Sequence, residues 1–248
     1  MNAISNNELK EIVNDAMENY HKSNLEKIKN IELKKLIGRR NPYLYRAQNS
    51  NIQSKILIKT TLNDFMTSSI ETVFGNLVFE PIATAITAKI SNGQAAPVEG
   101  VDIVVQTTKK YTAYAVKSGT NPQNASAKKR QNEEFNSIRA RVAKAKKQFD
   151  PVVAYSYGTV SDKRKEPTKN KNYREVAGKE FWEEISGDSN MYQKISMLIG
   201  SINNPNYENE IMNTEKRLHD EFVNKGLSTV DGKVNWDKFT EFVSEKSW

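Results

Sequence analysis

The sequence predicts an α/β fold in which a mixed β-sheet is flanked by helices and both ends of the chain are helical. Three observations lead to this prediction: helical spacing of apolar residues near the N-terminus, β-branched runs in the middle, and a strand–helix–strand succession that joins two of those runs. The 248 residues contain no internal repeat, and we expect a single domain over residues 1–248. Within it we expect a helical part (1–66), an α/β core (67–177) and a second helical part (178–248).

Helices are predicted for the first third of the chain. Ser5 can cap a helix whose apolar residues recur at i, i+3, i+4 and i+7, and Asn41-Pro42 ends this pattern. A short helix is expected over residues 53–65. Another is expected to begin near Thr67, with a kink at Pro81 because proline cannot donate the helical hydrogen bond.

The middle of the chain changes to the pattern of strands. Residues 101–106 and 111–117 are rich in β-branched and aromatic side chains and are separated by a short turn, so they should form a hairpin. An amphipathic helix is predicted over residues 126–149, and the continuously apolar segment 151–158 is typical of a buried parallel strand. Together these elements form a βαβ unit, and the chain from about residue 178 onward is expected to be helical.

The composition excludes several classes of protein. The absence of cysteine excludes disulfide scaffolds, cysteine-ligated zinc and thiol catalysis, and two histidines cannot build a multi-histidine metal site. The glycine-rich motifs of nucleotide and dinucleotide sites are missing, so we expect no nucleotide cofactor. No uninterrupted apolar run reaches the roughly 18 residues of a membrane span, so we expect no membrane partner. The polar N-terminus lacks the apolar region of a signal peptide, and we expect a cytoplasmic location.

The charge of the chain favours a polyanionic partner. The net charge is +7 and the isoelectric point about 9.3, and nucleic acid is favoured over a membrane surface because no basic amphipathic segment has flanking aromatic anchors. Basic residues gather at the start of the helix at 126–149 and in the loop at 159–174. We expect both groups to contact phosphates, although a solvated helix face and a flexible loop are the alternatives. The residues are Lys128, Lys129 and Arg130 in the helix, and Lys163, Arg164 and Lys165 in the loop.

The predicted hairpin carries the residues best suited to chemistry. Alternation along the strands places Asp102 on one face, and pairing can bring Lys117 of the next strand to the same end of the hairpin. A carboxylate can hold a divalent metal ion, and a lysine beside it can lower the pKa of a water molecule or position it against a phosphodiester. The alternative for this pair is a salt bridge at the edge of a strand.

The residues around this pair resemble a known family. Residues 99–102 and 114–119 together look like the active-site signature of the PD-(D/E)xK nuclease superfamily. Residues 116–121, which read Val-Lys-Ser-Gly-Thr-Asn, are more closely similar to the KSGxN subgroup of type II restriction endonucleases. The likeness extends roughly from Ser68 to Trp182, with a weaker echo near Asp231-Gly232.

The resemblance implies a restriction-endonuclease-like fold and a Mg²⁺-dependent enzyme that cuts double-stranded DNA and leaves 5′-phosphate ends. It implies that Asp102 and the carbonyl of Val116 hold the metal ion, that Lys117 orients or activates water, and that Asn121 lies among the DNA-binding residues. Enzymes of this kind read palindromes, so a homodimer with an interface on the terminal helices is expected. The alternatives are a structure-specific repair or recombination nuclease, and a DNA-binding protein without catalysis.

One position departs from the superfamily pattern. An acid is expected two residues before the lysine, and this chain has Ala115, so a second acidic ligand must come from elsewhere. At about 100° per residue, Glu71 lies about 60° from the centre of the apolar face of its helix and Glu80 about 120° away. We therefore expect Glu71 to be the second catalytic and metal-binding acid and Glu80 to face solvent. The other candidates are Glu99, Glu133 and Glu134.

Overall fold

The computed structural model describes residues 3–38, 40–120 and 125–245, and these form two compact units. The first, which we call the sheet unit, contains Met1–Tyr20 and Thr72–Asn203. The second, which we call the helical unit, contains His21–Glu71 and Asn204–Trp248. The sheet unit thus extends beyond the core expected at 67–177, because a segment near the N-terminus and a segment after residue 177 join it.

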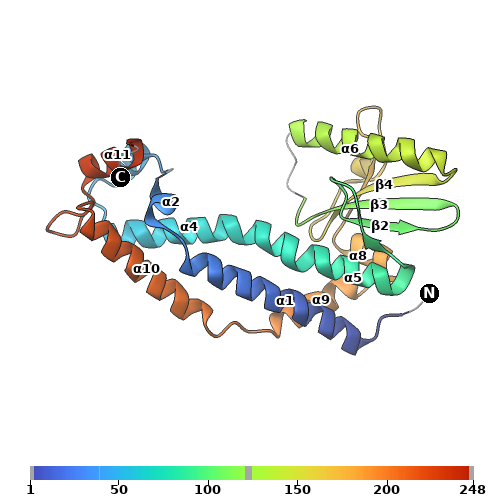
Figure 1. Cartoon of the computed structure of the whole chain (residues 1–248), viewed down its shortest axis with the longest axis horizontal. Coiled ribbons are helices and arrows are strands. Elements are labelled where there is room, and N and C mark those ends of the chain that lie inside the picture. The colour runs from blue at the N-terminus through green and yellow to red at the C-terminus, as the bar shows by residue number, and fades with distance from the viewer. Residues whose placement is uncertain (1–2, 39, 121–124, 246–248) are drawn as a thin grey trace. The chain divides into compact units, whose positions relative to one another are not determined.

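The sheet has five strands in the order β1-β2-β3-β4-β5, as Figure 1 shows for the three that it labels. Its first two pairings are antiparallel and its last two parallel, so it is a mixed sheet. The predicted hairpin and the parallel pairing of the βαβ unit are confirmed, whereas β1 and β5 were not foreseen. The strands are β1 (Gln94–Ala95), β2 (Ile103–Gln106), β3 (Lys110–Lys117), β4 (Gln148–Tyr155) and β5 (Arg174–Ala177).

Helices cover both faces of the sheet, as predicted for this fold class. Helix α6 (Ala125–Lys144) packs Phe135 and Ile138 against a buried cluster that includes Ala113 and Val153. On the opposite face lie α5 (Glu80–Ser91) and α8 (Lys179–Ser186), and the ring of Phe181 in α8 approaches Tyr114 of β3 to 6.4 Å between centroids. The unit is completed by α7 (Asp162–Lys165) and α9 (Met191–Gly200). Helix α6 is shorter than predicted, because residues 148 and 149 belong to β4.

One continuous helix replaces the two helices predicted between residues 53 and 91. Helix α4 (Ser54–Phe74) passes through a five-residue π-helical segment, η1 (Gly75–Phe79), directly into α5. The expected break near Thr67 is absent, and Pro81 lies in the first turn of α5, directly after the π-helical segment. A π-helical segment changes the direction in which all later side chains point, because its hydrogen bonds run from i to i+5.

The same helix has the length and composition of a membrane span. The segment Ser54–Ser91 contains an 18-residue window with a mean hydropathy of 1.2. The search for uninterrupted apolar runs did not find this window, because polar residues interrupt its apolar runs. Core helices of proteins that never enter a membrane meet the same criteria. Leu57, Ile58 and Ile82 of this helix are fully buried inside the protein.

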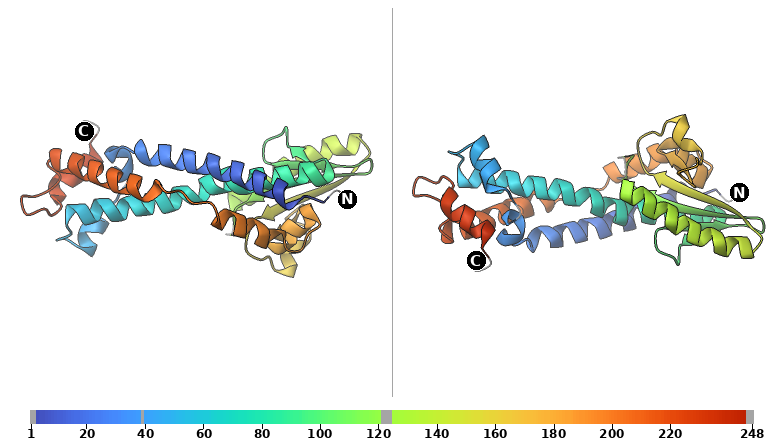
Figure 2. Two further views of the ribbon diagram at one scale, coloured as in Figure 1. Left: turned by 90° about the horizontal axis from the view of Figure 1, so that it is seen from below. Right: turned by 90° about the horizontal axis from the view of Figure 1, so that it is seen from above.

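The helical unit has its own apolar core. Figure 2 shows α10 (Tyr207–Asn224) beside the end of α1 (Asn6–Lys29), where Thr214 donates a hydrogen bond of 3.3 Å to the carbonyl of Ile28. The single helix expected before the Asn41-Pro42 break is divided into two, with a turn near Asn30. The other helices of this unit are α2 (Leu33–Ile37), α3 (Pro42–Gln48) and α11 (Trp236–Ser244).

A charged network ties the sheet to α8. Arg174 of β5 donates to Asp150 at 2.8 Å and to Glu184 at 2.6 Å, and Lys110 lies 2.7 Å from Asp150. Burial alone would raise the pKa of Asp150, but hydrogen bonds from Arg174 and Lys110 outweigh it and hold the pKa below its ordinary value. The network therefore stabilises the fold above the unfolded-state pKa of about 3.9, and this contribution is lost as the pH falls through the lower folded-state pKa.

We expect Asp150→Asn to lower the free energy of unfolding at neutral pH by about 3 kcal/mol, because it leaves two cations without their shared carboxylate. The loss should shrink as the pH falls, since acid also neutralises Asp150 in the unmodified protein. Urea unfolding at several pH values measures both effects. Asp162→Asn, at a side chain that is 97% exposed, is the matched control and should change little. A pH-independent loss in Asp150→Asn would contradict the electrostatic explanation.

Candidate active site

The structure brings Asp102 and Lys117 together, as the hairpin pattern predicted. The Nζ atom of Lys117 lies 3.9 Å from Oδ2 of Asp102. Asp102 directly precedes β2, and its backbone N–H donates to the carbonyl of Tyr114 at 2.8 Å. The same Oδ2 accepts a 2.6 Å hydrogen bond from the backbone N–H of Val116. The carboxylate is thus fixed by the backbone of the neighbouring strand, while 39% of the lysine side chain remains exposed.

Glu80 is the acid that interacts with this pair. It is the first residue of α5 and is half-buried, so the expectation that it faces solvent is wrong. Burial raises the pKa of Glu80, the charge of Asp102 raises it further, and Lys117 acts in the opposite direction. Each of these electrostatic effects requires the groups to lie near one another. Lys117 thus forms an ion pair with Asp102 and interacts electrostatically with Glu80.

The charges at this site are incompletely balanced. Burial raises the pKa of Asp102, and the nearby charge of Glu134 raises it further, although Lys117 and the Val116 N–H act against the shift. A bound divalent cation would reverse such shifts, because it favours the ionised form of every carboxylate that touches it. The site has the electrostatic character of a cation site, independent of any motif.

The donor atoms fit a hard metal ion. The N–H of Val116 points towards Asp102, while the carbonyl of Lys117 accepts from Ser156 on the other side of β3. Because successive residues of a strand direct their backbone groups to opposite sides, the Val116 carbonyl faces the side of Asp102. Among the described residues, no three acidic or histidine side chains lie close enough to hold a metal. Two carboxylates and a carbonyl are nevertheless sufficient for Mg²⁺, which keeps waters and substrate oxygens in its shell.

The other candidate acids have different surroundings. Glu71 lies in the helical unit and is exposed, and its proposed metal-binding role stays a prediction. Glu134 accepts from Arg130 at 2.8 Å, and the same arginine contacts Glu99. Glu133 lies 3.9 Å from Lys129. The helix-face argument failed at Glu80 because η1 lies between residues 71 and 80, so 100° per residue does not hold across that interval.

The basic residues expected to contact DNA fall into two groups. In the part of the chain that the structure describes, ion pairs involve Lys129 and Arg130, as above, and also Lys165, which lies 2.6 Å from Glu180. Lys128 and Lys163 take part in none of the ion pairs of the described residues. Asn121 lies outside the described residues. Contact with DNA remains a prediction for the whole set.

Arg164 has a structural partner that the sequence pattern did not reveal. It lies 2.5 Å from Glu175, a β5 residue that is only 3% exposed, and Lys171 lies 3.2 Å from the same carboxylate. An isolated buried carboxylate is strongly unfavourable, and these two cations compensate the buried carboxylate of Glu175. The only trace of this ion pair in the sequence is an acid inside the apolar run of β5. We did not predict that strand.

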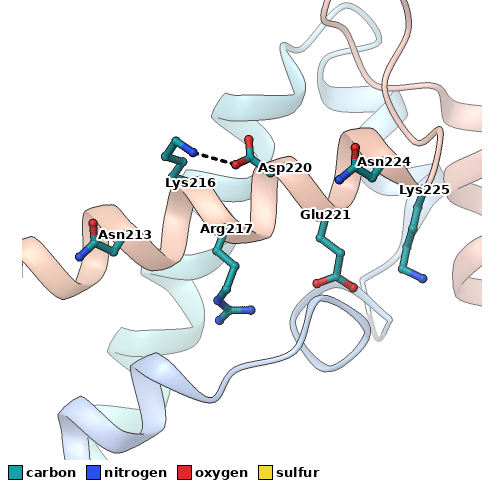
Figure 3. A pocket seen from close by; sticks show the side chains of 7 residues that line it. All are labelled: Asn213, Lys216, Arg217, Asp220, Glu221, Asn224 and Lys225. Carbon is teal, nitrogen blue, oxygen red and sulfur yellow. Dashed lines mark hydrogen bonds and ion pairs between the residues drawn. The ribbon is translucent and has the colours of Figure 1, made fainter.

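A pocket lies on the helical unit, as Figure 3 shows. Its lining residues belong to α10, except Lys225, which directly follows that helix. Lys216 pairs with Asp220 at 3.0 Å, and Arg217 donates to the carbonyls of Lys29 and Ile31. Lys216 and Arg217 are both held by partners within the unit, so we assign this pocket no catalytic role.

Comparison with known proteins agrees with the geometry of the sheet unit. The model of the family described as type II restriction endonuclease EcoO109I matches residues 7–206, which include the whole sheet, Glu80, Asp102 and Lys117. No curated protein matches the chain.

Proposed function

Since the chain belongs to the type II restriction endonuclease EcoO109I family, we propose that it is a Mg²⁺-dependent, site-specific endonuclease that cuts double-stranded DNA and leaves 5′-phosphate ends. The observation that carries this proposal is the approach of Lys117 to within 3.9 Å of Asp102, with Glu80 near enough that the charges of both residues shift its pKa. Carboxylates that can hold a divalent metal ion, beside an amine at the carboxyl end of β3, suit metal-assisted phosphodiester hydrolysis.

We assign the metal to Asp102 and Glu80, with the Val116 carbonyl as a third donor. When bound, Mg²⁺ supplies positive charge that stabilises the phosphate as it becomes five-coordinate. The Val116 N–H keeps the Asp102 carboxylate in one orientation, so the ligand is in place before DNA arrives. Glu71, which the helix-face argument favoured, is the alternative second ligand.

We assign the positioning of water to Lys117. Its ammonium group can donate three hydrogen bonds, and its exposed side chain reaches the solvent at the end of β3. Attack by water on phosphorus forms one P–O bond while the P–O3′ bond breaks; the attacking water releases a proton to solvent, and the departing 3′ oxygen takes up a proton from solvent. The products are a 5′-phosphate and a 3′-hydroxyl.

We propose a homodimer as the active form, because a two-fold dimer matches a palindromic site. The helical unit supports this with exposed apolar side chains. Tyr43 and Leu44 of α3 are 73% and 51% exposed, and Ile56 of α4 is 51% exposed. Burial of such side chains against a second copy would be favourable. The molar mass in solution measures this directly.

Metal dependence tests the proposed function. A plasmid digest should give discrete bands with Mg²⁺ or Mn²⁺, because both accept hard oxygen ligands, and Ca²⁺ should support binding without cleavage. Mapping the ends should show 5′-phosphates. Cleavage in excess EDTA would contradict the metal mechanism. Cutting confined to branched DNA would identify a structure-specific nuclease, and binding without any cutting would identify a DNA-binding protein without catalysis.

A further inference from the structure

A pocket of about 580 Å³ lies in the sheet unit beyond the carboxyl ends of β4 and β5. Its walls come from η1, from the segment after β4, and from α8 and α9. Five of its thirteen lining residues are aromatic, and the lining includes Phe79, Ser156, Tyr157, Lys179, Trp182 and Ser196.

The pocket adjoins the candidate active site. Since β3 and β4 are parallel, the residues after Lys117 and those after Tyr155 leave the sheet at the same edge. The N–H of Ser156 donates to the carbonyl of Lys117 at 2.9 Å, and the N–H of Tyr157 donates to Ser118 at 3.2 Å. Gly119 lies against the Tyr157 ring so closely that an added Cβ would come within 2.4 Å of it. The Tyr157 wall of the pocket is therefore in contact with the turn that follows Lys117.

The lining combines flat apolar surfaces with a few polar groups. The ring centroid of Phe79 lies 6.4 Å from those of both Tyr157 and Trp182. Ser156 is 4% exposed, and its Oγ has no hydrogen-bond partner within the described residues. A buried hydroxyl without a partner is costly, so it is a place where a ligand atom would be favoured. Lys179 is exposed and belongs to none of the ion pairs of the described residues.

We propose that this pocket receives one base of the DNA, unstacked from the duplex near the cleaved bond. The proposal rests on the proposed function, which brings DNA to the edge where Lys117 lies. A base offers a flat face for the aromatic wall and polar edge atoms for Ser156, and its phosphate would lie near the cation of Lys179. Stacking on aromatic side chains is a general means of holding an unpaired base, and it tolerates any base identity.

The test uses duplexes that carry the recognition sequence obtained from end mapping, with 2-aminopurine placed at one position after another. Ca²⁺ permits binding without cleavage. In the unmodified protein we expect the fluorescence at one position near the cut to change severalfold, because 2-aminopurine responds to loss of stacking. Ser196→Trp should abolish this change and weaken binding about tenfold, since the indole enters the pocket from an exposed position of α9.

Met197→Trp is the matched control. Met197 neighbours Ser196 on α9, is 75% exposed and does not line the pocket, so this variant should behave as the unmodified protein. If the protein cuts DNA but no position changes in fluorescence, or if Ser196→Trp retains the change, the pocket proposal is wrong and the proposed function stands. If no duplex or plasmid is cut at all, the proposed function fails and the base pocket fails with it.

Discussion

Lys117→Ala is expected to reduce the rate of DNA cleavage by about 10²–10⁴-fold, the range associated with loss of a positioned proton-transfer group. The lysine side chain is 39% exposed, and its ion-pair partner, Oδ2 of Asp102, also has the Val116 N–H as a partner. The fold and the affinity for DNA should therefore survive. Cleavage rates in single-turnover conditions with Mg²⁺, together with binding in Ca²⁺, separate the chemical step from association.

Lys109→Ala provides the matched control for Lys117→Ala. Lys109 is exposed and lies in the turn that connects β2 to β3, at the opposite end of the hairpin from Lys117. Removing it changes the net charge of the protein by the same amount, so it reports the general contribution of one positive charge to DNA binding. A Lys117→Ala variant that cuts as fast as Lys109→Ala would show that the hairpin end is not the active site.

The hairpin and its two reactive residues were predictable because strand geometry is local and regular. Alternation fixes which face each side chain occupies, and a short turn between β2 and β3 leaves little freedom of register. The observed pairing of Ile103 with Tyr114 follows from these constraints, and it brings Asp102 beside Val116. The βαβ unit was predictable for the same reason, because its buried strand reads as one apolar run.

The elements that escaped prediction depend on distant parts of the chain. Strand β1 has only two residues and forms by pairing with β2, so it has no periodicity of its own. In β5 the buried Glu175 interrupts the apolar pattern, and only the folded structure supplies the cations that tolerate it. The π-helical segment η1 is likewise invisible to a helical-wheel analysis, which assumes one rotation per residue throughout.

The largest consequence of η1 concerns the second acid, and Glu80→Gln tests it. This substitution keeps the size of the side chain but removes a carboxylate whose pKa is shifted by the charges of Asp102 and Lys117. We expect cleavage at limiting Mg²⁺ to fall by about 10²-fold or more, because one of two carboxylate ligands is lost, and to recover partly as Mg²⁺ is raised. A Mg²⁺ titration of the cleavage rate measures both effects. Circular dichroism confirms that the fold is retained.

Glu71→Gln is the matched comparison, since it makes the same chemical change on the other side of η1. Glu71 is exposed in the helical unit. Glu80 is half-buried, and its pKa is raised by burial and by the charge of Asp102, with Lys117 acting in the opposite direction. We therefore expect Glu71→Gln to cut at close to the unmodified rate across the titration. The reverse result, with Glu80→Gln active and Glu71→Gln inactive, would restore the helix-face argument and place the ligand at Glu71. If both variants cut normally, the second acid lies at Glu99, Glu133 or Glu134, or Asp102 suffices alone; Glu134 is the first to test, because its charge also raises the pKa of Asp102.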